Sequence, residues 1–239
     1  MSVPAPPGPG GRQQLPLALR YPPDQCFEAF VAASDATIAP LRALANGEGG
    51  ESVYLVGASG SGKTHLALAA CAAAERQGRT AAYIAPAAAA GRLREALGGL
   101  HESDFVAVDG LDAIAGHRED EVALFDFHNR TRDRGHAVVY TAACSPDALP
   151  LALPDLRSRL SQCTRVVLAT LDDAGRREVL LRRARRRGLQ VDAAAVDWLL
   201  RRTQRDLASL TALLDTLDRA SLAAQRRITV PFLREVLDG

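Results

Sequence analysis

A glycine-rich stretch, "GASGSGKTH" (residues 57–65), carries the spacing G-x-x-x-x-G-K-[ST]. Its glycines let the backbone curl so that consecutive N–H groups face a phosphate at the start of a helix. These glycines are Gly57, Gly60 and Gly62. Lys63 can reach the β- and γ-phosphates as a point charge, and the Thr64 hydroxyl can ligand Mg²⁺. The stretch predicts a nucleotide-phosphate site; the alternative is a chance glycine-rich turn.

Lys63 is the only lysine among the 29 basic side chains, and all the others are arginines. A chain with this bias is expected to keep a lysine where a compact ammonium on a flexible stem is required. A planar guanidinium does not replace such a group. The bias therefore supports the phosphate-binding interpretation of Lys63.

A second candidate is the apolar stretch "FVAVDGLD" (105–112), in which Asp109 ends an expected strand. Asp109 is suited to hold Mg²⁺ through water; the alternative is a charged residue that begins a turn. The next residue, Gly110, cannot orient an attacking water. Asp112 lies two residues further on and could replace the missing carboxylate, but simple loss of the general base is the favoured interpretation.

Strands alternate with helices from residue 52 to residue 170, which predicts a parallel sheet covered on both faces, an α/β fold. Strands are expected at 52–57, 80–86, 104–109, 137–142 and 164–170. Helices are expected at 63–78, 89–100 and 121–135, with another from residue 24 that contains Phe27 and Phe30.

Residues 171–239 have only helical patterns, with apolar residues three and four positions apart. Helices are expected at 172–187, 192–202, 205–224 and 231–237. We therefore divide the chain into a flexible, proline-rich and glycine-rich tail (1–20), an α/β domain (21–170) and a small all-α lid (171–239).

Composition limits the class of protein. The chain has 239 residues, of which 47% are hydrophobic, and no stretch has the roughly 18 uncharged apolar residues of a membrane span. No signal peptide is recognisable, so a cytoplasmic protein is expected. The four scattered cysteines indicate neither a disulfide framework nor a zinc site.

Four stretches resemble the AAA+ domain of the DnaA family of replication initiators, and more closely its regulatory Hda branch. They are "GKTHLALAAC" (62–71), "LFDFHNR" (124–130), "LPDLRSRL" (153–160) and "LDRASLAAQRRITVPFLREVL" (217–237). The resemblance extends from about residue 14 to the carboxyl terminus. It implies an AAA+ P-loop sheet followed by a helical lid, with ADP or ATP and Mg²⁺ as ligands.

The resemblance also implies roles for three further residues. Arg159 matches the arginine finger directed at nucleotide in a neighbouring subunit, with Arg157 as a competing candidate. Arg205 matches the sensor 2 arginine of the lid, although arginines are frequent in this region. Thr141 lies in the sensor 1 segment. The acidic and basic residues common soon afterwards in the family are replaced here by alanine and cysteine, which weakens the case for self-contained hydrolysis.

"QLPLAL" (14–19) resembles the short peptide by which the Hda branch binds the β sliding clamp. Gln14, Leu15 and Leu17 occupy the matching positions. An extended peptide suits this role because its leucines enter a preformed pocket and its glutamine hydrogen-bonds at the rim. The alternative is the first edge strand of the domain.

These features lead to one favoured function and two alternatives. Since the sequence ends after the lid, with no helix-turn-helix domain, we do not expect an origin-recognising initiator. We expect a regulator that binds the clamp and stimulates ATP hydrolysis by DnaA, with little or no turnover of its own and with homo-oligomers possible. The arginine run 182–187 can touch DNA phosphates or be a solvated helix face. The alternatives are an autonomous AAA+ ATPase, such as a helicase loader or remodelling motor, and a small-molecule P-loop kinase.

Overall fold

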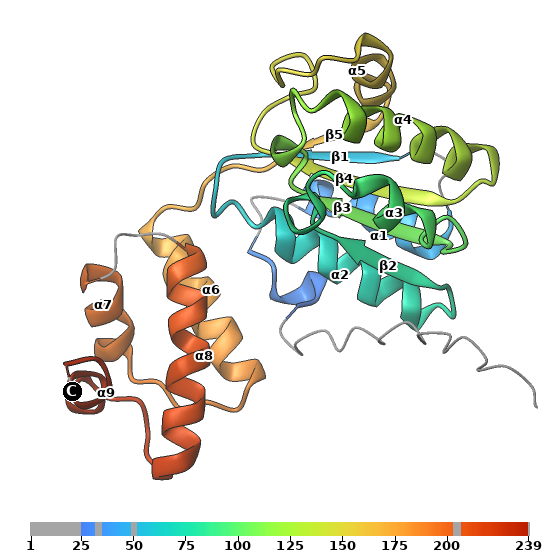
Figure 1. Ribbon diagram of the computed structural model, residues 1–239. Coiled ribbons are helices and arrows are strands. Elements are labelled where there is room, and N and C mark those ends of the chain that lie inside the picture. The colour runs from blue at the N-terminus through green and yellow to red at the C-terminus, as the bar shows by residue number, and fades with distance from the viewer. Residues whose placement is uncertain (1–24, 32–34, 49–51, 203–206, 239) are drawn as a thin grey trace, which may run out of the picture.

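Five parallel strands form the sheet of the α/β part, in the order β2-β3-β4-β1-β5 (Figure 1). The computed structural model describes residues 25–31, 35–48, 52–202 and 207–238. The strands are β1 Val53–Val56, β2 Ala81–Ile84, β3 Phe105–Asp109, β4 Ala137–Ala142 and β5 Thr164–Val167. The parallel sheet is therefore confirmed. The fifth strand ends at 167 instead of 170, because its partner β1 ends at Val56 and turns into the glycine-rich loop.

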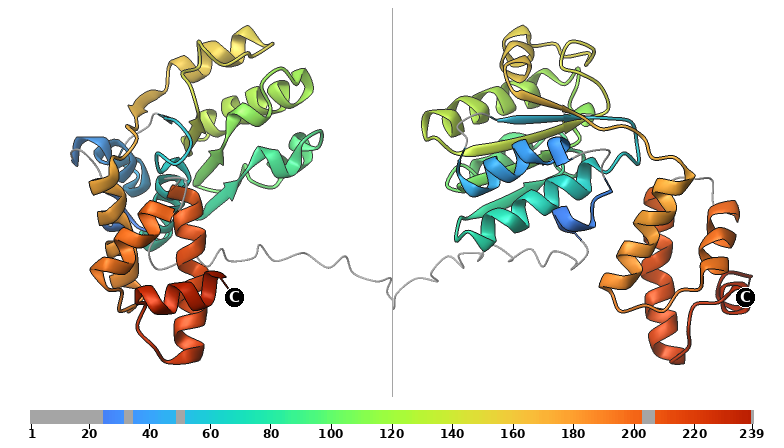
Figure 2. Two further views of the ribbon diagram at one scale, coloured as in Figure 1. Left: turned by 90° about the vertical axis from the view of Figure 1, so that its left-hand side faces the viewer. Right: turned by 180° about the vertical axis from the view of Figure 1, so that it is seen from behind.

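Helices cover both faces of this sheet, as expected for an α/β fold. One face carries α1 (Ala39–Asn46) and α2 (Lys63–Arg76), and the other carries α3 (Leu93–Gly98), α4 (Arg118–Asp133) and α5 (Pro154–Ser161) (Figure 2). Strand side chains alternate accordingly: Val53 and Leu55 pack in the first core, and Tyr54 packs in the second. The alternation places the two layers on opposite sides of one sheet.

Several boundaries differ from the sequence prediction. The helix expected from residue 24 is a short 3₁₀ turn, Phe27–Ala29, after which Phe30 is extended. The expected helix 89–100 is shorter, since a 3₁₀ turn at Pro86–Ala89 precedes α3. α4 begins at Arg118 instead of 121, and its acidic first turn suits the positive end of the helix dipole. A further 3₁₀ turn, Leu111–Ala113, follows β3.

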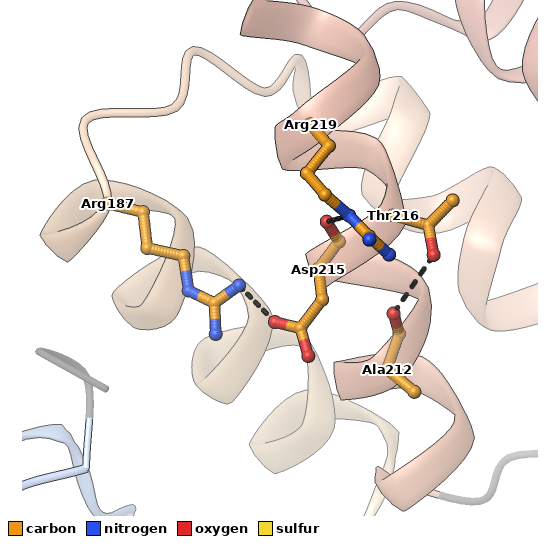
Figure 3. Close-up of polar contacts among 5 residues, drawn as sticks. All are labelled: Arg187, Ala212, Asp215, Thr216 and Arg219. Carbon is orange, nitrogen blue, oxygen red and sulfur yellow. Dashed lines mark hydrogen bonds and ion pairs between the residues drawn. The ribbon is translucent and has the colours of Figure 1, made fainter. Parts of the chain in front are cut away.

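The helical part contains α6 (Asp173–Arg186), α7 (Ala193–Arg202), α8 (Leu207–Ala224) and α9 (Val230–Asp238), close to the expected helices. It has its own apolar core, which includes Leu180, Val196, Leu199, Leu210, Leu217 and Phe232. An ion pair between Arg187 and Asp215 joins the end of α6 to α8 (Figure 3). The Arg187 side chain is only 11% exposed, but the Asp215 side chain is 56% exposed, so the ion pair lies at the surface of the helical part. Within the described ranges, no helix has the length and apolar character needed to cross a membrane.

Candidate nucleotide site

The glycine-rich loop connects β1 to α2 and depends on its glycines for its shape. A Cβ atom on Gly57 would lie 2.6 Å from Ser61 Oγ and 2.8 Å from the Leu168 carbonyl oxygen. A Cβ atom on Gly62 would lie 2.6 Å from Cε2 of Phe30. Gly60 and Gly62 also have positive φ angles of 74° and 95°, which glycine adopts without strain. The loop therefore has little tolerance for side chains at these positions.

Lys63 is the first residue of α2, and its side chain lies over the loop. Its Nζ donates to the carbonyl oxygens of Gly57, at 2.6 Å, and Ala58, at 2.9 Å. Burial lowers the pKa of Lys63, and the charges of Asp112 and Asp109 oppose this shift. The ammonium is thus held at the start of the helix, where phosphates would meet the free N–H groups.

Asp109, at the end of β3, accepts hydrogen bonds from three hydroxyl groups. Thr64 Oγ1 is 2.7 Å and Tyr83 Oη 2.8 Å from its Oδ2, and Thr141 Oγ1 donates to its Oδ1. The structure therefore brings Asp109, Thr64 and Thr141 together as the sequence predicted. The carboxylate and the Thr64 hydroxyl are hard oxygen donors of the kind that Mg²⁺ prefers.

The role of Tyr83 could not be predicted from the sequence. It lies within β2, where a tyrosine is an ordinary sheet residue, and only the pairing of β2 with β3 brings its hydroxyl to Asp109. Burial and the Asp109 carboxylate raise the pKa of Tyr83, so the hydroxyl stays protonated and remains a donor. Tyr83 therefore donates a hydrogen bond that orients the Asp109 carboxylate, and it adds no second negative charge to the site.

Asp112 and Gly110 lie beside this group. Both oxygens of Asp112 accept from the backbone N–H of Ala143, at 3.1 and 3.0 Å, directly after β4. Asp112 nevertheless acts on Lys63, since its charge raises the pKa of the lysine more than Asp109 does. Gly110 has a φ of 91°, a conformation that residues with side chains rarely adopt. A second carboxylate at 110 would therefore require a different backbone turn.

The segment before α1 and the lid meet at the beginning of α2. The Phe30 ring stacks on His65, with centroids 5.8 Å apart, and His65 lies 3.0 Å from both the Cys26 carbonyl oxygen and Nη2 of Arg183 on α6. An arginine only donates and a carbonyl only accepts, so Nδ1 of His65 accepts from Arg183 and Nε2 donates to Cys26. The sequence did not indicate this link, because it depends on where the lid lies.

A cavity lies at the same junction, next to the glycine-rich loop. Its lining includes Phe30, Val31, Ser61, Leu171, Val179 and Arg183. Apolar side chains from the segment before α1 and from the lid face the loop here. Such walls suit the flat apolar part of a bound nucleotide.

Four of the expected site residues lie outside the described residues. Arg205, expected to reach the phosphates from the lid, is one of them. Gln14, Leu15 and Leu17 of the expected clamp-binding peptide are the others. Their assigned roles remain predictions from the sequence.

Arg157 and Arg159 both lie on α5 but differ in their contacts. Nη2 of Arg157 donates to the Leu151 carbonyl oxygen at 2.7 Å, within its own segment. Among the described residues, the Arg159 guanidinium makes no hydrogen bond or ion pair, and its side chain is partly exposed. Of the two candidates, Arg159 is the one available to an external group.

Arg159 lies at the edge of the sheet opposite to the glycine-rich loop. It lines a pocket with Ser52 and His136, which precede β1 and β4. Gly57 instead follows the carboxyl end of β1. A four-residue strand separates the two edges by roughly 13 Å. Arg159 is therefore directed away from the chain's own loop.

Glu121, a buried carboxylate on α4, positions the segment that leads into α5. It accepts from the backbone N–H groups of Gly116, Ala152 and Leu153 at 2.8, 3.0 and 2.7 Å. Leu153 is the residue directly before α5. These bonds hold the start of the arginine-bearing helix against α4.

His128, on α4, is buried in the same region and should make the stability depend on pH. Burial and the charges of Arg159 and Arg132 lower the pKa of His128 from 6.5 to about 4. Between these two values the unfolded chain binds a proton that the folded chain does not, so stability is full above pH 6.5 and falls as the pH is lowered toward 4. By this linkage, the titration of His128 alone should lower the free energy of unfolding by about 2 kcal/mol between pH 7 and pH 5.

Urea unfolding at the two pH values tests this prediction. A His128→Gln variant should lose about 2 kcal/mol less than the parent on going from pH 7 to pH 5. His117→Gln, at an exposed histidine, is the matched control and should behave as the parent does. Equal losses in the parent and the His128→Gln variant would show that His128 does not titrate as described.

Two family models match the chain. The model described as IstB-like ATP binding protein matches residues 14–139, which is more than half of the sequence. The model described as Hda, lid domain, matches residues 173–237. The two matches cover the glycine-rich loop with most of the sheet, and the helical lid.

Solved structures of AAA+ proteins are similar in fold. Domain III of the replication initiation protein DnaA from Thermotoga maritima has a TM-score of 0.75 at 17% identity, covering 91% of this chain and 97% of that chain. AMPPCP-bound DnaA from Aquifex aeolicus has a TM-score of 0.63 at 20% identity, with 82% and 67% covered. The RuvB Holliday junction branch migration motor of Thermotoga maritima has a TM-score of 0.62 at 16% identity, with 90% and 71% covered. The chain therefore belongs to the IstB-like ATP-binding proteins, its residues 173–237 match the lid domain of Hda, and its fold is that of DnaA domain III.

Proposed function

We propose that the protein is a nucleotide-bound regulator of replication initiation that binds the β sliding clamp and stimulates ATP hydrolysis by DnaA, which prevents re-initiation. The observation that carries this proposal is the Arg159 guanidinium. It has no partner among the described residues and lies at the edge of the sheet away from the chain's own glycine-rich loop. An arginine placed in this way can act on nucleotide held by a neighbour.

In the partner, water attacks the γ-phosphorus of ATP, the bond to the bridging oxygen breaks, and its electrons leave with ADP. Negative charge is spread over the phosphate oxygens in the transition state, and an arginine supplied in trans stabilises that charge. DnaA is the partner that fits best, because the chain is related to it. A closed homo-oligomer would use the same edge.

In the protein's own site, nucleotide acts as a structural ligand. Lys63 and the loop N–H groups would hold its phosphates, and Thr64 and Asp109 would hold Mg²⁺. We expect ADP as the resident form. Gly110 provides no carboxylate to orient water, so turnover at this site should be slow. The role implied for Arg205 is to contact these phosphates from the lid. The ligand would fix the lid through the junction of His65 with Arg183.

Clamp binding is assigned to the peptide 14–19. Leu15 and Leu17 enter a pocket of the clamp and Gln14 hydrogen-bonds at its rim, in the manner of other short extended peptides. The clamp on DNA would raise the local concentration of the protein near DnaA. In the run 182–187, Arg183 contacts His65 and Arg187 contacts Asp215, so the exposed Arg185 and Arg186 are the side chains that would lie near DNA phosphates, without needing to read sequence.

An autonomous ATPase of the helicase-loader or remodelling type is the second candidate. Asp112 favours it, because its charge acts on Lys63 and its carboxylate is fixed by the Ala143 N–H. Steady turnover by the isolated protein would support this candidate. For a regulator that acts on DnaA, we expect the isolated protein to hydrolyse ATP weakly or not at all.

Reconstitution with purified DnaA tests the proposed function. DnaA carrying ATP is mixed with the protein and with clamp loaded on DNA, and the conversion of ATP to ADP is followed. The parent should accelerate the conversion only when clamp is present. A variant with alanine at Gln14, Leu15 and Leu17 should lose both clamp binding and acceleration. If the parent gives no acceleration with loaded clamp, the proposed function is wrong.

A further inference from the structure

The pocket that contains Arg159 gathers several basic side chains at the amino edge of the sheet. Its lining consists of Ser52, His128, Arg132, His136, Arg159, Gln162 and Cys163. The lining contains two guanidinium groups and two imidazoles, and it contains no carboxylate. A hollow of this composition carries net positive charge and suits an anion.

Arg132 contributes to this positive charge as directly as Arg159 does. The charges of both arginines lower the pKa of His128, so both guanidinium groups lie near the same imidazole. Arg132 is exposed, and among the described residues its side chain has no carboxylate partner and makes no hydrogen bond. Two arginines that converge on one hollow without neutralisation repel each other, and an anion between them would relieve the repulsion.

His136 adds an unsatisfied polar atom to the pocket. Its Nδ1 is buried and has no hydrogen-bond partner among the described residues. A buried polar atom without a partner costs free energy, and in native proteins it commonly marks a ligand or water site. In the tautomer with its hydrogen on Nδ1, the ring could donate to a phosphate oxygen. Nearby, Ser52 and Gln162 offer neutral donors.

We propose that this pocket binds the terminal phosphates of a nucleoside triphosphate held by the neighbouring subunit, with Arg132 as a second cation beside Arg159. The inference rests on the proposed function, which uses Arg159 alone, and extends it to Arg132 and His136. One guanidinium can contact two oxygens of the transferring phosphate at most, and a second guanidinium can contact the remaining oxygen.

The arrangement favours a compact phosphate group over nucleic acid. The two guanidinium groups come from the end of α4 and from α5, and together with the residues before β1 and β4 they line one hollow. Duplex DNA carries its charges along an extended axis and is bound by cations spread over a surface. Binding of DNA at this pocket is therefore an outcome that would count against the inference.

The first experiment uses saturating protein with DnaA that carries ATP, under single-turnover conditions. Arg132→Ala should lower the rate of phosphate release on the order of 10²-fold, as for loss of one charge-stabilising donor. Its affinity for the clamp should be unchanged. Arg130→Ala removes the same charge from an exposed position two residues earlier on α4 and should keep the parental rate. Arg132→Lys should recover only part of it, since an ammonium lacks the planar fork.

The second experiment does not depend on DnaA. The protein's own site is filled with saturating ADP, tripolyphosphate is added, and the ring signals of His128 and His136 are followed by NMR. The signals should shift in the parent and in Arg130→Ala, but not in Arg132→Ala or Arg159→Ala. If these signals shift but the parent does not stimulate DnaA, the pocket binds phosphate groups and the proposed function is wrong. The inference is overturned if the parent shows no shift, if a DNA duplex shifts these signals and tripolyphosphate does not, or if Arg132→Ala stimulates DnaA as well as the parent does.

Discussion

Arg159→Ala should reduce the stimulation of DnaA's ATPase by about 10³-fold or more, because arginines supplied in trans contribute 10³–10⁵ to such rates. The variant should fold normally, since the Arg159 guanidinium makes no contact with a carboxylate among the described residues. Binding of clamp and of the protein's own nucleotide should also be unchanged. The measurement is the single-turnover conversion of ATP to ADP on DnaA, at a protein concentration that saturates the complex.

Arg157→Ala is the matched control for this prediction. Its guanidinium donates to the Leu151 carbonyl oxygen, so its removal disturbs the segment before α5 but takes no cation from the pocket. We expect a smaller loss, on the order of tenfold, with lower thermal stability. If Arg157→Ala lost the larger factor and Arg159→Ala kept the parental rate, the roles assigned to the two arginines would be reversed.

Lys63→Ala should weaken binding of ADP and ATP by about 10²-fold or more. Hydrogen bonds to a charged group contribute about 1.5–3 kcal/mol each, and Lys63 can contact two phosphates. Binding measured by fluorescence of a labelled ADP tests the affinity directly. Thermal unfolding gives a second measure, because a ligand at 1,000 times its Kd stabilises the fold by about 4 kcal/mol. At the same ADP concentration a 100-fold weaker variant is at about 10 times its Kd and gains only about 1.4 kcal/mol. The melting temperature of the parent should therefore rise with ADP by about two to three times as much as that of the variant.

Arg76→Ala removes one positive charge from the other end of α2 and serves as the control. Its Nε donates only to the Ala72 carbonyl oxygen, one turn earlier. This variant should bind ADP as the parent does. If ADP raised the melting temperature of Lys63→Ala as much as that of the parent, Lys63 would not be part of the nucleotide site.

The central part of the site could be predicted because it follows from local sequence and sheet geometry. The spacing of the glycine-rich loop is a local pattern, and β1, β3 and β4 are parallel neighbours. Their carboxyl ends meet at one edge, which brings Asp109 and Thr141 to Thr64. A single sequence contains all of this information.

The other features of the site could not be predicted, because they depend on contacts between segments far apart in the chain. Tyr83 reaches Asp109 only through the pairing of β2 with β3. The link from His65 to Arg183 requires the position of the lid. The helix expected from residue 24 was wrong because Phe30 packs in an extended segment against Gly62, and tertiary packing overrides local helix preference.

Arg159 could be predicted only in part from the sequence. The family resemblance indicated its role, and the sequence left Arg157 as a competitor. The distinction came from the Leu151 carbonyl oxygen, which holds Arg157, and from Glu121, which fixes the start of α5. Neither contact has a recognisable pattern in the sequence.

The central claim is that catalysis takes place on the partner's nucleotide and not on the protein's own. The most direct test places γ-labelled ATP on one protein at a time, either on DnaA or on this protein, before mixing the two with loaded clamp. We predict rapid release of labelled phosphate when the label starts on DnaA, and release no faster than for the isolated protein when it starts on this chain. Rapid release from label on this chain, with none from label on DnaA, would contradict the account.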